Sequence, residues 1–186
     1  MRKKILVVML IVGMFMIPAL SFAGSDDVNW DSYLRPGNFI MQAGVGWGWG
    51  WNAWYSGFGV YGGAEMIMAE YKIADIIPLE FGAAAKGAVT FGVFGMGINA
   101  GALATAHLSF KGLNLPFDYL DNLDVYIGLG LGMTLDMSSY ATVPFQLGLA
   151  SSSGASYFLN DNLAIYLEET YFANFWASSL GVLLKL

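Results

Sequence analysis

The sequence predicts an all-β protein, a closed antiparallel eight-stranded transmembrane β-barrel with an up-and-down meander. Three observations lead to this prediction. Residues 124–137 alternate without exception between large aliphatic residues and glycine, hydroxyl-bearing, aromatic or acidic residues. Hydrophobic residues make up 56% of the chain and charged residues only 12%, whereas soluble domains usually carry about a quarter charged residues. The 24 glycines disfavour a bundle of helices.

The alternation in residues 124–137 is typical of a long β-strand, because successive side chains leave opposite faces of a strand. Strands of soluble proteins usually have ~5–6 residues. A strand that crosses an outer membrane needs ~9–11 residues, with lipid on one face and a polar interior on the other. One face of this segment carries Val125, Ile127, Leu129, Leu131, Met133, Leu135 and Met137. We expect that face to contact lipid.

The same pattern recurs along the rest of the chain and predicts seven further strands. Residues 88–106 carry no charge, but their glycines favour two strands around a loop at residues 94–97 over one helix. Glu169 falls on the lipid side of its strand, which indicates either a site near an interface or a bulge that shifts the register. An even number of strands places both termini on the periplasmic side. The expected strands span about 38–51, 55–72, 79–91, 99–110, 124–137, 143–157, 163–172 and a last segment that ends at residue 186.

The N-terminus reads as an export signal. Arg2, Lys3 and Lys4 precede an apolar run, and Ser21-Phe22-Ala23 resembles a cleavage site with small residues. A retained membrane anchor is the alternative. We therefore expect a signal peptide at residues 1–23, a periplasmic leader at 24–37 and the barrel at 38–186, located in the outer membrane of a diderm bacterium.

Charge and cysteine content exclude several classes of function. Cleavage after residue 23 removes three basic residues and no acidic one, which leaves five basic and 14 acidic residues and a net charge of −9. Nucleic acid is therefore not an expected partner, since phosphate binding needs basic patches. The chain has no cysteine, which rules out disulfides, thiolate metal sites and lipid attachment through cysteine. The sequence shows no metal site and calls for no cofactor.

The inward-facing residues sort by position along the strands. In the outer half they are mostly glycine, and in the periplasmic half they are large or charged, Tyr71 among them. We interpret this as an outward-facing vestibule above a closed periplasmic plug; the alternative is that the glycines only relieve crowding. Hairpin symmetry about residues 73–77 predicts a salt bridge between Glu65 and Lys86, because a buried charge needs a partner. The expected interior charge network comprises Glu65, Glu80, Lys86, His107, Glu168 and Lys185.

The predicted outer joints are uncharged and aromatic. The aromatic residues indicate a girdle at the membrane interface, or a rim that handles apolar ligands. The set comprises Trp47, Trp49, Trp51, Trp54, Tyr55, Tyr140, Phe175 and Trp176.

The chain resembles the small eight-stranded outer-membrane barrels of the OmpA, OmpX and OmpW kind. The resemblance rests on Tyr157 to Tyr171, with its Asn160-Asp161-Asn162 turn, and on the glycine-alternating segment Tyr126 to Gly132. It covers about residues 38–186 and implies insertion by the barrel-insertion machinery, with periplasmic chaperones and outer-membrane lipid as partners. The family usually ends on Phe, whereas this chain ends on an alternating Leu180, Val182, Leu184 and Leu186, which we expect to act as the insertion signal.

The expected function is that of an integral outer-membrane barrel, structural or passive, that could also bind or pass small hydrophobic molecules, as the OmpW resemblance implies. The alternatives are a soluble periplasmic binder of lipophiles similar to a lipocalin, and an outer-membrane acyl-transfer enzyme. The single histidine, His107, has no acid–base residues around it at a recognisable spacing, so we expect a packing role and no catalytic residues.

Overall fold

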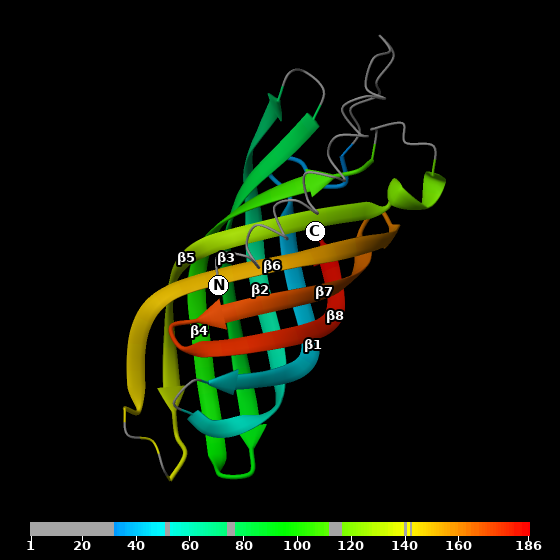
Figure 1. Ribbon diagram of the computed structural model, residues 1–186. Coiled ribbons are helices and arrows are strands. Elements are labelled where there is room, and N and C mark those ends of the chain that lie inside the picture. The colour runs from blue at the N-terminus through cyan, green and yellow to red at the C-terminus, as the bar shows by residue number, and fades with distance from the viewer. Residues whose placement is uncertain (1–31, 51–52, 74–76, 112–116, 140, 142) are drawn as a thin grey trace, which may run out of the picture.

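The computed structural model describes residues 32–50, 53–73, 77–111, 117–139, 141 and 143–186. Eight antiparallel strands close into one barrel, in which each strand pairs with the next along the chain and β8 pairs with β1 (Figure 1). The predicted fold is thereby confirmed. The strands are β1 (Phe39–Gly50), β2 (Ala53–Ile73), β3 (Ile77–Gly92), β4 (Gly95–Ser109), β5 (Leu123–Asp136), β6 (Phe145–Asn160), β7 (Leu163–Phe172) and β8 (Phe175–Lys185).

The strands are strongly staggered around the barrel. A row of paired residues starts at Ile40 in β1 and passes through β2 to β8 in turn. It returns to β1 at Gly50, ten residues further along. Such a stagger requires tilted strands, and an eight-stranded barrel is just wide enough for side chains to fill its interior. The side chains inside the barrel therefore determine whether a molecule can enter it or pass through it.

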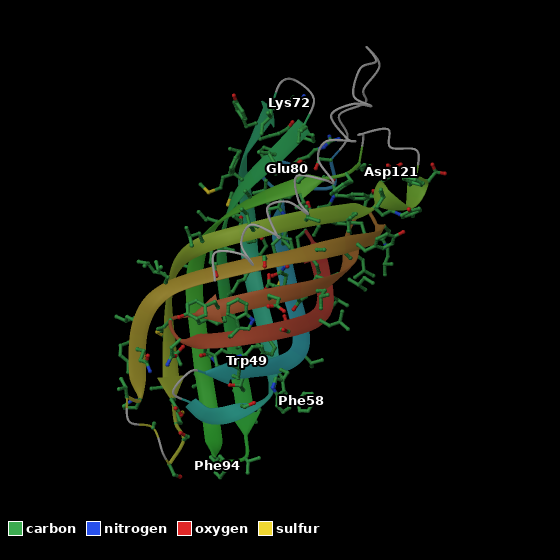
Figure 2. The ribbon with its side chains drawn as sticks, viewed as in Figure 1. Trp49, Phe58, Lys72, Glu80, Phe94 and Asp121 are labelled. Carbon is green, nitrogen blue, oxygen red and sulfur yellow. The ribbon has the colours of Figure 1, made fainter. Side chains whose placement is uncertain are left out.

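The two ends of the barrel differ. One end, which we call the terminal end, carries the segment 32–38 and the C-terminus, since the Leu186 amide donates to the Phe39 carbonyl at 2.8 Å. The C-terminal ends of β1, β3, β5 and β7 lie at the opposite end, which we call the hairpin end. Figure 2 places Lys72 and Asp121 toward the terminal end and Trp49, Phe58 and Phe94 toward the hairpin end.

Residue alternation separates the outer face from the interior as predicted. In β5, Leu129 and Leu131 are 65% and 70% exposed, whereas Asp124 and Tyr126, at the alternate positions, are buried. In β4 the same rule leaves Leu103, Thr105, His107 and Ser109 buried. The outer face is therefore apolar, and the buried interior contains most of the polar side chains.

The β2–β3 hairpin extends past the barrel wall at the terminal end (Figure 1). Phe39 at the start of β1 pairs with Met66, and Glu80 in β3 is the first residue to pair with β4, so β2 and β3 form a two-stranded ribbon beyond these points. A bulge between Ile67 and Ala69 shifts the register at its base. The bulge reverses the faces beyond it, which is why Tyr71 is exposed and the prediction that it points inward is wrong.

One further expectation concerns the position of Glu169. Glu169 in β7 lies on the exposed face as predicted, and it accepts hydrogen bonds from Trp176 Nε1 at 2.8 Å and Ser178 Oγ at 3.0 Å.

The joint between β4 and β5 contains a short 3₁₀ helix, η1 (Asp118–Leu120). Among the described residues, no helix has the length and apolar character needed to cross a membrane. The expected signal peptide and residues 24–31 of the leader lie outside the described residues.

Candidate functional site: the charged interior of the barrel

His107 lies between two buried carboxylates inside the barrel. Its Nδ1 is 2.9 Å from Asp124 Oδ2, and its Nε2 is 2.9 Å from Glu65 Oε1. The Thr105 hydroxyl also donates to Glu65 Oε1. A carboxylate can only accept, so the doubly protonated imidazolium satisfies both sides, and the triad joins β2, β4 and β5. The expectation that no acid–base residues surround His107 is therefore wrong.

A second ion pair joins Lys86 in β3 to Glu168 in β7, across the interior. Glu168 also accepts hydrogen bonds from the Tyr126 hydroxyl at 2.7 Å and the Thr170 hydroxyl at 2.9 Å. The centroid of the Tyr126 ring lies 5.1 Å from the centroid of the His107 ring and 4.9 Å from Lys86 Nζ. Tyr126 thus connects the two charged groups into one network.

The predicted pairing of Glu65 with Lys86 is wrong. The structure pairs Glu65 with Ala84, and Lys86 with Gly63. An unbroken ladder that starts at the Ile73–Ile77 pair would set Lys86 opposite Ala64, so the assumed register was one residue off from the start. The bulge between Ile67 and Ala69 shifts the register by one residue more. Each charge consequently has a partner from a strand that is distant in sequence.

The two remaining residues of the predicted network, Glu80 and Lys185, lie in different parts of the barrel. Glu80 is fully buried beside His107, its cross-strand neighbour. Lys185 lies at the terminal end, where its Nζ donates to the Tyr33 carbonyl at 2.8 Å. Asp124 was absent from the predicted network, although its place on the inward face of β5, in phase with Tyr126, could have indicated it. Among the described residues, no group of three or more histidine and acidic side chains is placed to hold a metal ion.

The interior at the hairpin end is filled by aromatic rings. Phe172 and Phe175 are buried in an apolar cluster with Tyr61, Leu103 and small residues of β3, β6 and β8. Phe175 is fully buried, so its prediction as a rim residue is wrong: it is in phase with the buried Ala177 of β8 and pairs with the buried Phe172 of β7. A side chain at Gly48 would overlap the Phe175 ring, and one at Gly101 would press on Phe172. The glycines therefore make room for these rings, which supports the crowding explanation over an open vestibule.

The remaining rim residues are described only in part. Trp47, Trp49 and Trp176 are exposed on the outer face, and the Trp49 and Trp176 ring centroids lie 6.5 Å apart. Trp51 and Tyr140 lie outside the described residues, as do the side chains of Trp54 and Tyr55. At the other end of β8, the predicted insertion residues Leu180, Val182, Leu184 and Leu186 all face outward. Their role in insertion stays a prediction.

The leader enters the barrel at the terminal end. Leu34 is fully buried in a cluster with Ile40, Ile67, Phe158 and neighbouring residues. The Tyr33 ring stacks on Phe158 with 4.2 Å between the centroids, and its hydroxyl donates to Asn122 Oδ1 at 2.6 Å. Residues 32–34 thus close this end of the barrel, a role that the sequence pattern did not reveal because three residues show no periodicity.

Comparison with known proteins reveals similarity of structure only. No protein-family model matches the chain, and no curated protein matches it in sequence. Among solved structures, the chain is similar to Ail, the attachment invasion locus protein of Yersinia pestis, with a TM-score of 0.52 and 12% identity over 82% of this chain and 100% of that one. It is also similar to the N-terminal β-barrel domain of Pseudomonas aeruginosa OprF, with a TM-score of 0.50 and 16% identity over 82% and 100% of the two chains. The protein therefore has the fold of the small eight-stranded outer-membrane β-barrels.

Proposed function

We propose that the protein is an integral outer-membrane barrel with a passive or structural role and a closed interior. The observation that carries this proposal is the inverted polarity of the barrel. Large apolar side chains such as Phe58, Leu131 and Leu147 are exposed, while Glu65, Lys86 and Glu168 are buried. Contiguous exposed apolar surface of this kind is typical of a surface that lipid covers.

The same observation argues against a soluble carrier of lipophiles. Such a carrier would place apolar residues inside the barrel and polar residues outside, whereas this interior holds several carboxylates together with Lys86 and His107. Washing bacterial membranes with carbonate or urea tests the difference. We expect the protein to remain in the outer-membrane fraction; release into the wash would contradict the proposal.

The closed interior follows from the side chains that fill it. The aromatic layer with Phe172 and Phe175, the ionic network and the leader residues 32–34 occupy successive levels of the barrel. In a planar bilayer we expect no steady porin-like current from the purified protein. A stable current at neutral pH would contradict the closed interior, although it would leave the membrane location intact.

We also propose that the protein has no catalytic function. An acyl-transfer enzyme needs a histidine that reaches lipid, and His107 is buried between Asp124, Glu65 and the Tyr126 ring. Assay of acyl transfer from phospholipid to lipopolysaccharide, with the folded protein in vesicles, tests this point. Transfer above the protein-free background would refute it.

Binding of small hydrophobic molecules is a second proposal, supported by the apolar layer at the hairpin end. Phe172, Phe175 and Tyr61 offer apolar surface there, close to the exposed Trp49 and Trp176. A ligand would have to displace the rings, because Phe172 and Phe175 pack against Gly101 and Gly48 in the interior at this end. Titration of the refolded protein with a fluorescent apolar probe tests this: Phe175→Ala should alter probe binding, whereas Leu159→Ala at the terminal end should not. Equal binding by both variants would exclude the layer as the site.

Assembly partners follow from the fold. We propose that the outward-facing Leu180, Val182, Leu184 and Leu186 of the last strand are the residues recognised by the barrel-insertion machinery, after delivery by periplasmic chaperones. Replacement of Leu186 by Asp should lower the amount of folded barrel in the membrane. The fraction that migrates as the folded form on a gel without boiling measures that amount.

A further inference from the structure

Glu80 is fully buried, and the nearby Ser32 hydroxyl is too poorly placed to form a well-aligned hydrogen bond with either oxygen of its carboxylate. Its cross-strand neighbours are His107 in β4 and Glu70 in β2. Asp124 in β5 lies close enough to interact with it electrostatically, and Ser32 of the leader faces its carboxylate. Figure 2 shows Glu80 at the base of the projecting ribbon that ends at Lys72.

The charges around Glu80 do not balance if every carboxylate is ionised. Lys86 neutralises Glu168, and the His107 imidazolium lies between Glu65 and Asp124. These pairs already contain one more negative than positive charge, and an ionised Glu80 would add another, opposite the like charge of Glu70. An uncompensated buried charge is strongly unfavourable, and like charges directly opposite each other destabilise a strand pair.

The lysines at the terminal end are engaged elsewhere. Lys185 Nζ donates to the Tyr33 carbonyl, and Lys111 Nζ lies 4.2 Å from the Tyr33 ring centroid and 3.9 Å from Asp161 Oδ1. Lys72 Nζ lies 3.9 Å from Glu70 Oε1 at the surface of the ribbon. None of these lysines donates a hydrogen bond to the Glu80 carboxylate.

We propose that Glu80, His107, Glu65 and Asp124 form a proton-binding site beneath the leader, with the proton held on Glu80. A neutral Glu80 adds no second negative charge to the one that the pairs already carry in excess, and the proton exchanges with water at the terminal end of the barrel. When Glu80 loses the proton, the bare carboxylate must draw in water. Since Ser32 faces it, the leader is the segment that this hydration displaces. The site thereby couples proton binding to closure of the terminal end, a property beyond the passive role proposed above.

Infrared spectroscopy of the folded barrel in detergent micelles tests the proton directly. We expect a band from a protonated carboxylic acid at neutral pH that is lost in Glu80→Gln and kept in Asp136→Asn, a matched control because Asp136 is also a buried carboxylate but lies at the hairpin end, outside the cluster. Absence of the band in the unmodified protein, or its persistence in Glu80→Gln, would overturn the proposal. Because the measurement needs neither a membrane location nor a closed pore, its failure is separable from failure of the proposed function.

Labelling of the leader tests the coupling. The chain has no cysteine, so Ser32→Cys provides a single thiol, and Tyr119→Cys at the exposed η1 provides a reference for the intrinsic effect of pH on thiol reactivity. We expect the ratio of the labelling rate at position 32 to the rate at position 119 to rise several-fold between pH 5 and pH 9. The ratio should stay constant when Glu80→Gln is added. A ratio that does not change with pH in the unmodified background, or that rises equally with Glu80→Gln, would refute the coupling.

Discussion

Lys86 illustrates how the closed barrel determines the partner of a single charge. It lies in β3, and its carboxylate partner Glu168 lies in β7, 82 residues away in the chain. A strand-level argument can only pair it with residues of β2 or β4. The buried pair is sensitive to loss of one member, because the remaining charge is left without compensation in the interior.

The pairing of Lys86 with Glu168 predicts that a charge reversal at position 86 is rescued by a second reversal at position 168. Lys86→Glu should lower the free energy of unfolding by at least about 3–5 kcal/mol, the cost typical of breaking a buried ion pair. Adding Glu168→Lys should restore most of the loss, since the pair is then reversed. Urea unfolding in detergent, followed by gel mobility without boiling, measures the changes.

The control for this rescue is the pair that hairpin symmetry favours. Lys86→Glu combined with Glu65→Lys should not recover stability, because Glu65 is bound to His107 and Thr105 and not to Lys86. Recovery by the second combination but not by the first would show that the structural pairing is wrong.

At the scale of elements, the leader behaves as part of the barrel although it belongs to no strand. Leu34 is buried with residues from β1, β2, β6, β7 and β8. Gly37 N and Asn38 O pair with the backbone of Ile67 at 2.8 and 3.0 Å, which extends the β1–β2 ladder to the base of the ribbon. Beyond this point β2 and β3 pair only with each other. The backbone hydrogen bonds at Ile67 therefore hold the leader in addition to the contacts of Tyr33 and Leu34.

Removal of the Leu34 side chain should therefore weaken the barrel. We expect Leu34→Ala to cost about 2–5 kcal/mol, as is usual when a buried leucine leaves a cavity. Leu159→Ala is the matched control, because Leu159 lies at the same end of the barrel and is 56% exposed. Urea unfolding midpoints compare the two; an equal effect of both substitutions would show that the leader is not packed inside the barrel.

For the whole molecule, the alternation of faces determines which side chains contact lipid. Leu129, Leu131 and Val182 face outward, and Ser152 and Ser179 are buried in the interior. Glu169 is a charged residue on the outer face, where hydrogen bonds from Trp176 and Ser178 satisfy its carboxylate.

Spin labels on single introduced cysteines test this arrangement. In lipid vesicles, labels at 129, 131 and 182 should be accessible to oxygen dissolved in the hydrocarbon, and labels at 152 and 179 should not. Serine positions are preferable to Gly130 or Gly181 for the interior, since a Cβ at either glycine would collide with the neighbouring backbone. The reverse accessibility pattern would contradict the membrane barrel as a whole.

The failures of prediction have separate physical causes. Alternation gives the face of each residue but not the residue opposite it. The bulge between Ile67 and Ala69 misplaced Tyr71, and an error of one residue in the assumed hairpin register added to the bulge in misplacing the partner of Lys86. Phe175 was misassigned because it was grouped with the outer joint, although the alternation of the last strand places it inward with Ala177, and Gly48 of β1 leaves room for its ring. The bulge, by contrast, leaves no periodic signal in the sequence.

Local periodicity by itself determined the eight strands, their two faces and the apolar surface, because side-chain direction repeats every two residues along any strand. Only the tertiary structure decided how the interior is filled. Closure with its ten-residue stagger brings Lys86 to Glu168, His107 to Asp124 and the leader to the terminal end, and these contacts depend on distances between strands that no local pattern encodes.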